Sequence, residues 1–247
     1  MRSYDTVGVS TDTVVAVGVD ACPAGWVATV LGEKSTTIET HKEFSEITGS
    51  YSGAHQILVD VPIGLPDKMR RACDEEAREL LGCRQSSVFF PPCTAAVDLK
   101  DYEDANDAQQ EHIGHGLSQQ AHNISPKIRE VRDVVGDHYD GVVRESHPEL
   151  CFAALNGQPI AYPKSSPRGR GQRMHLLSEV LENAVNLYEN TREEYLLKQV
   201  RRDDILDSMV LAVAARESSL DTVPSEPVSD DPRIYYPGFE TPSISVE

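Results

Sequence analysis

The sequence predicts a mixed α/β domain in which an antiparallel meander of strands leads into alternating strands and helices. Three observations support this fold class. Three β-type runs follow one another near the start of the chain, separated by short turns. A later apolar run carries an acid and is closed by Pro and Gly. Segments with helical apolar stripes then dominate the second half of the chain.

The first three segments are expected to be paired strands. Residues 14–19 are a run of small and β-branched apolar side chains that ends at Asp20, which is typical of a buried strand. Residues 26–31 and 35–44 also have β-type patterns, and only short connections separate the three segments. Short connections favour antiparallel pairing, so we expect a meander with the first strand near the centre of the sheet.

Helix and strand are expected to alternate after the meander. A helix is predicted around residues 44–53, and a doubly buried strand at 56–61 with Asp60 inside it. Residues 70–81 combine strong helix formers with i,i+4 charge pairs. Gly82 follows them at the position where a helix-ending glycine is expected.

The second half of the chain is expected to be mainly helical. Residues 84–126 are the least regular part of the chain, polar and partly helical, and we interpret them as an insertion over the core, in the manner of a lid. A helix at 127–135 and a strand at 142–146 follow. Apolar stripes then predict helices at 172–188 and 204–215.

We expect one main domain. It spans residues 13–217 and contains the insertion at about 84–126. Residues 1–12 are predicted to be a flexible N-terminal tail. Residues 218–247 are rich in Pro and Ser and are expected to be mostly irregular, with the motif RIYYP forming a last short strand.

Composition limits the compartment and the partners. The formal charge is −17, and Lys is much rarer than Arg. Such a surface resembles that of proteins from salt-rich cytoplasm, and it argues against a general nucleic-acid-binding surface because phosphate contacts need Lys and Arg. No stretch approaches the roughly 18 to 20 apolar residues of a membrane span, and five Cys without a CxxC motif argue against a disulfide framework. We therefore expect a cytoplasmic protein with no membrane partner, and its oligomeric state stays open.

Three acids stand at positions where a carboxylate is costly. Asp20 ends an apolar strand, Asp60 interrupts one, and Asp207 lies in an otherwise apolar helix close to Asp203 and Asp204. Buried carboxylates are rare unless they are paired or bind a metal, and ligands of open α/β sheets gather at the carboxyl ends of strands. Each acid also has a structural interpretation, because Asp20 and Asp60 could accept hydrogen bonds in turns and Asp203 or Asp204 could cap the helix.

Converging carboxylates without Cys or His select hard cations, so we expect Mg²⁺ or Mn²⁺. The expected ligands are Asp20, Asp60, Asp204 and Asp207. Two such ions, roughly 3.5 to 4 Å apart, can stabilise both the attacking and the leaving oxygen of phosphoryl transfer. The catalytic residues would be Asp20, Asp60 and Asp207. The carboxylates of Asp20, Asp60 and at least one of Asp204 and Asp207 should then lie within about 8 Å of one another.

Basic side chains are the candidates for contacts with substrate phosphates. Solvated helix faces and loops are the alternative interpretation of each basic cluster. The candidates are Arg129, Lys164, Arg168 and Arg170.

Two further motifs have both a chemical and a structural interpretation. Glu145 and His147 are two residues apart on an expected strand, so they share a face and could be accessory acid–base residues. A buried His bonded to the backbone is the alternative. Ser86 and Ser87 beside Arg84 could bind phosphate or could only fold the turn.

Several motifs make the sequence similar to a known family. In chain order they are VGVDACPAGW, VDVPIGLP, RRACDEEAR, RQSSVFFPP, SPKIREV, ESHPELCFAALNG and DDILDSMVLA. Over residues 14–216 they resemble the widespread microbial family catalogued as domain of unknown function 429. Its members are described as predicted nucleases, so the resemblance implies an RNase H-like fold and metal-dependent nuclease activity.

The resemblance also implies roles for the acids. Asp20 matches the acid that closes the first strand of RNase H-like folds, and Asp60 matches the acid on the fourth strand. Asp204 and Asp207 match the paired acids on the last helix of the Holliday-junction-resolvase branch. The family's own motif, which has no general RNase H counterpart, contains Glu145, His147 and Glu149.

The expected function is therefore metal-dependent cleavage of nucleic-acid phosphodiester bonds. Two other classes stay open. A binding or regulatory protein that keeps the fold without cleavage is favoured by the overall acidity. A small-molecule phosphotransferase is the other, although the Cys-Pro-Ala-Gly turn after Asp20 differs from a phosphate-cradling Gly/Thr loop.

Overall fold

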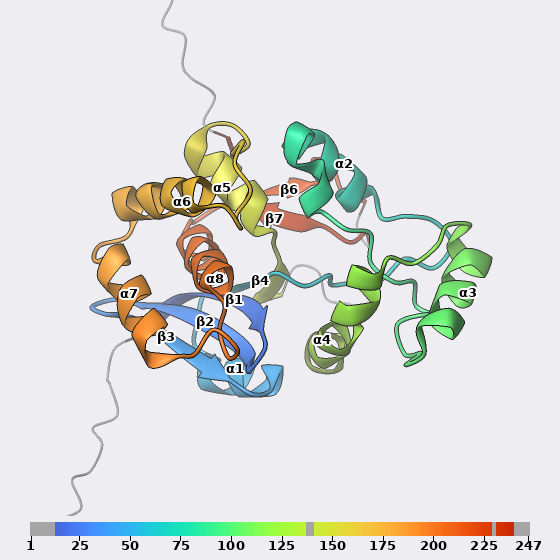
Figure 1. Cartoon of the computed structure of the whole chain (residues 1–247), viewed down its shortest axis with the longest axis horizontal. Coiled ribbons are helices and arrows are strands. Elements are labelled where there is room, and N and C mark those ends of the chain that lie inside the picture. Colours follow the sequence, from blue (N-terminus) through green and yellow to red (C-terminus); the bar gives the residue numbers. More distant parts are fainter. Residues whose placement is uncertain (1–12, 137–140, 229–230, 240–247) are drawn as a thin grey trace, which may run out of the picture.

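A five-stranded mixed sheet organises the chain, as the computed structural model shows for residues 13–136, 141–228 and 231–239 (Figure 1). The expected tail at 1–12 lies outside these described residues. The strand order is β3-β2-β1-β4-β5. The strands are β1 (Val14–Cys22), β2 (Gly25–Gly32), β3 (Thr36–His41), β4 (Gln56–Val59) and β5 (Val143–Glu145).

The topology confirms the predicted fold class. β1, β2 and β3 form an antiparallel meander, and β4 and β5 continue the sheet in parallel pairing. β1 lies at the centre, because it is paired with β2 on one edge and β4 on the other. This mixed sheet with helices on both faces is consistent with an RNase H-like α/β fold.

Helices cover both faces of the sheet. α8 crosses β1, β2 and β4 on one face, with α5 and α6 packed against α8 (Figure 1). α1 and the last turns of α4 cover the other face. The helices are α1 (Phe44–Ser50), α2 (Ala72–Leu81), α3 (Tyr102–Ile113), α4 (Gln119–Val135), α5 (Pro148–Asn156), α6 (Pro167–Val180), α7 (Ala184–Glu194) and α8 (Arg202–Ala215), with a 3₁₀ helix η1 at Gly82–Ser87.

Side chains of the central strand alternate between two apolar cores. Ala16 and Cys22 belong to the core under α8, whereas Val17 and Val19 belong to the core under α1 and α4. This alternation follows from the two-residue period of a strand. From Ala16 onward the even-numbered residues of β1, Asp20 among them, therefore face α8.

Two predicted helix boundaries are wrong. The helix expected at 127–135 begins at Gln119, because Ser118 caps it by accepting a hydrogen bond from the Ala121 N–H at 3.1 Å. The single helix expected at 172–188 is two helices, α6 and α7. Asn183 lies between them with a φ of 60°, and a residue in this left-handed conformation cannot continue an α-helix.

Helix α5 was absent from the prediction, and α3 lies in the segment for which no helix bounds were predicted. α5 is an apolar segment whose residues from Pro148 to Ala153 are all buried, so it shows no amphipathic stripe. His147 caps it and Pro148 occupies its first turn. The expected strands are present but shifted at their ends: β1 continues to Cys22 because it pairs with β2 as far as Gly25, and β4 ends before Asp60.

A two-stranded ribbon closes the described part of the C-terminal segment. β6 (Asp221–Val223) pairs antiparallel with β7 (Ile234–Tyr236), which coincides with the expected RIYYP strand. Ser146 anchors the ribbon by donating its Oγ–H to the Tyr235 carbonyl at 2.6 Å. Among the described residues, no helix is both long and apolar enough to cross a membrane.

Candidate functional site

The parallel register of β1 and β4 brings two acids to the same level of the sheet. Val19 pairs with Val59, and the Asp60 N–H donates to the Val19 carbonyl at 3.1 Å. Asp20 follows Val19 and Asp60 follows Val59, so the two acids lie on neighbouring strands near the C-terminal ends of β1 and β4. Asp20 is only 7% exposed, whereas Asp60 is partly exposed.

Close packing of α8 on β1 brings a third acid to this end of the strands. A Cβ on Gly18 would lie 2.2 Å from the Ser208 carbonyl oxygen, so the helix backbone rests directly on the strand. The Ser208 and Thr29 hydroxyls are 2.9 Å apart and fix the same crossing. Asp207, next to Ser208, is 1% exposed and is held against the Asp20 side of the sheet.

Mutual repulsion and burial shift the pKa values of these acids. The pKa of Asp20 is raised well above its usual value, first by burial and then by the charges of Asp60 and Asp207. Burial, with Asp60 contributing, raises the pKa of Asp207 from 3.8 to about 6, although Lys164 opposes the shift. The pKa of Asp60 is raised by burial as well. The three charges are therefore close enough to interact directly.

Asp204 has both a structural and an electrostatic place in the site. It accepts a hydrogen bond from the Arg201 N–H at 2.9 Å, which is the helix-capping role that the sequence left open. It is also 5% exposed, and its charge raises the pKa of Asp20. Burial raises the pKa of Asp204 itself to about 6.

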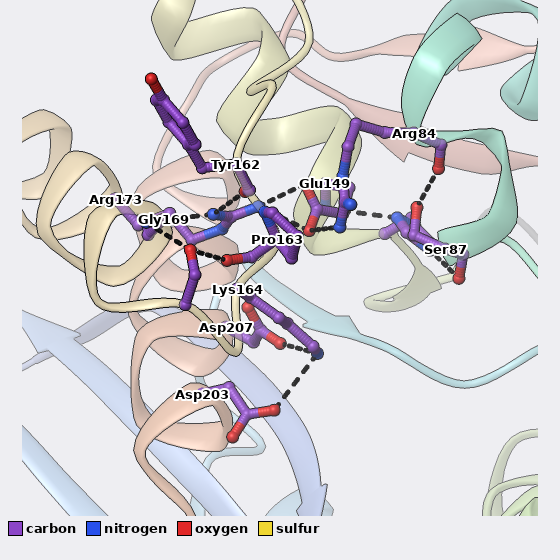
Figure 2. Close-up of polar contacts among 12 residues, drawn as sticks. Arg84, Ser87, Glu149, Tyr162, Pro163, Lys164, Gly169, Arg173, Asp203 and Asp207 are labelled. Carbon is purple, nitrogen blue, oxygen red and sulfur yellow. Dashed lines mark hydrogen bonds and ion pairs between the residues drawn. The ribbon is translucent and has the colours of Figure 1, made fainter.

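One lysine opposes this negative charge. Lys164 donates its Nζ–H to Asp207 Oδ2 at 2.6 Å and lies 3.7 Å from Asp203 Oδ2 (Figure 2). The neighbouring charge of Asp207 is the main reason why the pKa of Lys164 is raised. A single ammonium group thus faces Asp20, Asp60 and Asp207 together.

A buried ion pair holds the loop that carries Lys164. Arg173 Nη2 donates to both oxygens of Glu149, at 2.6 and 2.7 Å, and Arg84 Nη2 lies 3.4 Å from Glu149 Oε1 (Figure 2). Arg173 Nη1 donates to the carbonyls of Tyr162 and Gly169, on either side of the Lys164 loop. Arg173 was not predicted from the sequence, because an arginine inside a helix has no pattern that separates a buried anchor from a solvated charge.

Asp60, Asp207 and Lys164 line a pocket of about 240 Å³, whereas Asp20 and Asp204 do not belong to its lining. His147 orients its wall: Nδ1 accepts from the Glu149 N–H at 3.2 Å, and Nε2 lies 3.3 Å from the Ser87 carbonyl oxygen. Ser87 in turn donates its Oγ–H to the Arg84 carbonyl at 2.8 Å, which folds the turn. The polar residues that line the pocket are Asp60, Arg84, Ser86, Ser87, Gln120, His147, Glu149, Lys164 and Asp207.

Glu145 does not lie in this pocket. Both of its oxygens accept hydrogen bonds from Arg71, each at 2.8 Å, and Oε2 also accepts from the Ile63 N–H at 2.7 Å. Arg71 further binds Asp74, so the three side chains form a buried ionic cluster. Glu145 and His147 are therefore not joined as an acid–base pair; Glu145 has a structural partner, and His147 alone reaches the pocket.

Of the four basic residues expected to bind substrate, only Lys164 lines the pocket. Arg129 donates to the Val97 carbonyl at 2.5 Å. Arg168 lies over the Tyr162 ring, 5.7 Å from its centroid, and Arg170 donates to the Ser165 carbonyl at 2.5 Å. These three arginines stabilise local structure in the described chain.

The pKa shifts predict an unusual pH dependence of stability in metal-free protein. Burial raises the pKa of Asp207 and Asp204 from 3.8 to about 6, and that of Glu145 from 4.5 to about 7. A group that binds its proton more tightly when folded contributes stability at low pH, and this stability is lost as the pH rises through the folded pKa. Lys164 contributes nothing in this window, because its pKa is already 10.5 before it is raised.

We therefore expect the thermal midpoint, measured by scanning fluorimetry in chelator at constant ionic strength, to fall between about pH 5 and pH 7.5. A midpoint that rises over this interval would contradict the conclusion that burial disfavours the ionised forms of these acids.

The comparisons with known proteins give one match. A family model described as "Protein of unknown function (DUF429)" matches residues 18–232. This range contains the strands, helices and acids that form the pocket. No curated protein and no solved structure matches the chain.

Proposed function

The chain belongs to that family of unknown function, and we propose that it is a metal-dependent nuclease, a hydrolase that cleaves nucleic-acid phosphodiester bonds. The observation that carries the proposal is the charge in and beside the pocket, because Asp60 and Asp207 line it and the buried Asp20 interacts with both. Asp20, Asp60 and Asp207 interact at close range, and Lys164 is the cation that faces all three. A site with surplus buried negative charge favours binding of a cation.

The donor atoms fit Mg²⁺ or Mn²⁺. Carboxylate oxygens are the ligands that these hard cations prefer. Asp20, Asp60 and Asp207, with Asp204 beside them, are the residues that would hold the metal. Such an ion supplies Lewis-acid stabilisation of phosphate charge and lowers the pKa of a bound water. Among the described residues, no three His, Cys, Asp or Glu side chains are arranged as a ready ligand set, and the Lys164 ammonium group is in direct contact with Asp207.

The remaining groups of the pocket fit a phosphate. Lys164 and Arg84 supply positive charge, and Ser86 supplies a hydroxyl group in the same wall. His147 contacts the backbone carbonyl of Ser87 and so positions this wall. In the proposed reaction, Lys164 and Arg84 neutralise the non-bridging oxygens of the scissile phosphate, and the turn at 84–87 orients it above the acids.

A second candidate function is supported by the same lysine. The Lys164–Asp207 contact at 2.6 Å compensates part of the acidic charge without a metal. This arrangement favours a protein that binds a phosphorylated ligand and does not cleave it. The two functions differ in whether metal binds and whether products form.

The test is cleavage and metal binding by the wild-type protein. End-labelled DNA and RNA, single- and double-stranded, are incubated in high salt with Mn²⁺, with Mg²⁺, or with EDTA. We expect shortened products only with metal, because the metal ion would stabilise the charge of the reacting phosphate. We also expect saturable Mn²⁺ binding in a calorimetric titration, because the clustered carboxylates are suitable ligands.

Two outcomes contradict the nuclease. The absence of both Mn²⁺ binding and products would favour the binding protein, and products that form equally in EDTA would exclude metal dependence.

A further inference from the structure

The acid pocket adjoins two larger cavities. The first, which we call the α2 hollow, has a volume of about 320 Å³ and is lined by residues of α2, η1 and the following loop, and of the α3–α4 region. The second, which we call the β1 hollow, has a volume of about 640 Å³ and is lined by the end of β1, by α4 and by Arg201. Phe89 and Gln120 belong to the walls of all three cavities. The cavities therefore meet at these two residues, with the acid pocket as their common neighbour.

Both flanking hollows are basic in a strongly acidic protein. Arg70 and Arg78 line the α2 hollow, and Arg201 lines the β1 hollow together with Lys127, which is paired with Glu130 at 2.8 Å. Among the described residues, neither hollow is lined by an Asp or Glu. The whole chain has 40 acidic and 23 basic residues, so this charge is the opposite of the average. Such a local reversal fits a polyanion that runs through both hollows.

We infer that the three cavities form one groove that holds a single strand of nucleic acid across the acid pocket. This inference rests on the proposed function, because it names the substrate class of the same site. Phe89 is the stacking platform where the cavities meet. Arg70 binds phosphate on one side of the pocket, and Arg201 binds phosphate on the other. Arg78, which donates to the Gln85 and Val88 carbonyls, and Lys127, which pairs with Glu130, add positive charge beside them.

The depth of the acids favours a single strand over a duplex. Asp20 and Asp207 are 7% and 1% exposed, so the reacting phosphate must descend below the surface to approach them. A single strand can bend into the pocket, whereas a stiff duplex holds its phosphates on a convex surface. Phe89 is partly exposed and packs on the small apolar cluster around Cys93, so its ring is held in place while part of it stays accessible.

Direct binding tests the groove without any cleavage. Fluorescent oligothymidylate and oligouridylate of about 20 nucleotides, and a duplex of the same length, are titrated in EDTA and followed by anisotropy. We expect the better single strand to bind at least about 10-fold more tightly than the duplex. Phe89→Leu keeps the apolar contact with the cluster but removes the aromatic face, so it should weaken single-strand binding by about 5-fold or more.

The salt dependence of binding tests the flanking charges. The double variant Arg70→Gln, Arg201→Gln removes one charge from each hollow. For a single strand, the slope of log K against log salt should become less steep by about 0.7 for each charge removed. Arg216→Gln is the matched control, because Arg216 is exposed, contacts the Val180 carbonyl and lies outside the groove. It should leave the slope unchanged.

The outcomes separate this inference from the proposed function. Selective single-strand binding that depends on Phe89 and on both arginines supports the groove even if no hydrolysis is found. Cleavage by the wild type with unchanged binding by the Phe89 and arginine variants overturns the groove and leaves the nuclease standing. Equal affinity for single strand and duplex also overturns it. Thermal midpoints of the variants near that of the wild type exclude unfolding as the cause of weaker binding.

Discussion

Asp20→Asn is expected to abolish metal-dependent cleavage and to leave the fold intact. Asn is nearly isosteric with Asp but has no charge, so it is a much weaker ligand for Mg²⁺ or Mn²⁺. Loss of an outer-shell partner of a metal ligand already costs about 10- to 100-fold in affinity or activity. Removal of a ligand should therefore reduce the cleavage rate by more than about 100-fold, measured on labelled DNA and RNA with Mn²⁺.

Stability gives this variant a second readout. Burial and three neighbouring acids raise the pKa of Asp20, so its ionised form destabilises the metal-free protein at neutral pH. Asp20→Asn should accordingly melt at the same temperature as the wild type in EDTA, or higher. Asp98→Asn is the matched control: it removes one acidic charge from an exposed ion pair with Arg132 and should keep full activity. Equal cleavage by Asp20→Asn and the wild type would show that the activity belongs to another site or another protein.

The fold was predictable where residue patterns report directly on the environment. The continuous run of small and β-branched apolar residues in β1 and its short connections indicate a buried strand at the centre of a meander, and the structure has one. Helix boundaries in the second half depended on single residues. Asn183 ends a helical pattern through its left-handed backbone, which the apolar period does not reveal. Helix α5 is buried on all sides, so its sequence has no amphipathic period.

The candidate site was predictable only in part, for a related reason. An acid inside an apolar strand or helix is visible in the sequence, as with Asp20 and Asp207. The partner of a buried charge is set by tertiary packing and is not visible there. Glu145 thus binds Arg71, and Glu149 binds Arg173, although nothing in their spacing distinguishes these anchors from catalytic groups.

Gly18→Ala is expected to have the largest effect on stability, because the helix that carries Asp207 rests on this residue. A Cβ at position 18 would lie 2.1 Å from the Ala212 backbone nitrogen and 2.2 Å from the Ser208 carbonyl oxygen. Backbone atoms cannot rotate away as a flexible side chain can, so α8 must move as a unit. Overpacking of a core usually costs about 1–3 kcal/mol, and we expect at least the upper end of this range in denaturant unfolding.

Gly171→Ala is the matched control for this substitution. Gly171 lies in α6, and a Cβ there would have no neighbour within 4 Å. Alanine should therefore stabilise the helix, by up to about 1 kcal/mol. The two variants make the same chemical change with opposite signs, so their difference isolates the contact between α8 and β1. That contact also places Asp207 beside Asp20, and any Gly18→Ala protein that remains folded should bind Mn²⁺ more weakly than the wild type. A Gly18→Ala protein as stable as Gly171→Ala would mean that α8 does not rest on β1, and the acids would then have no shared site.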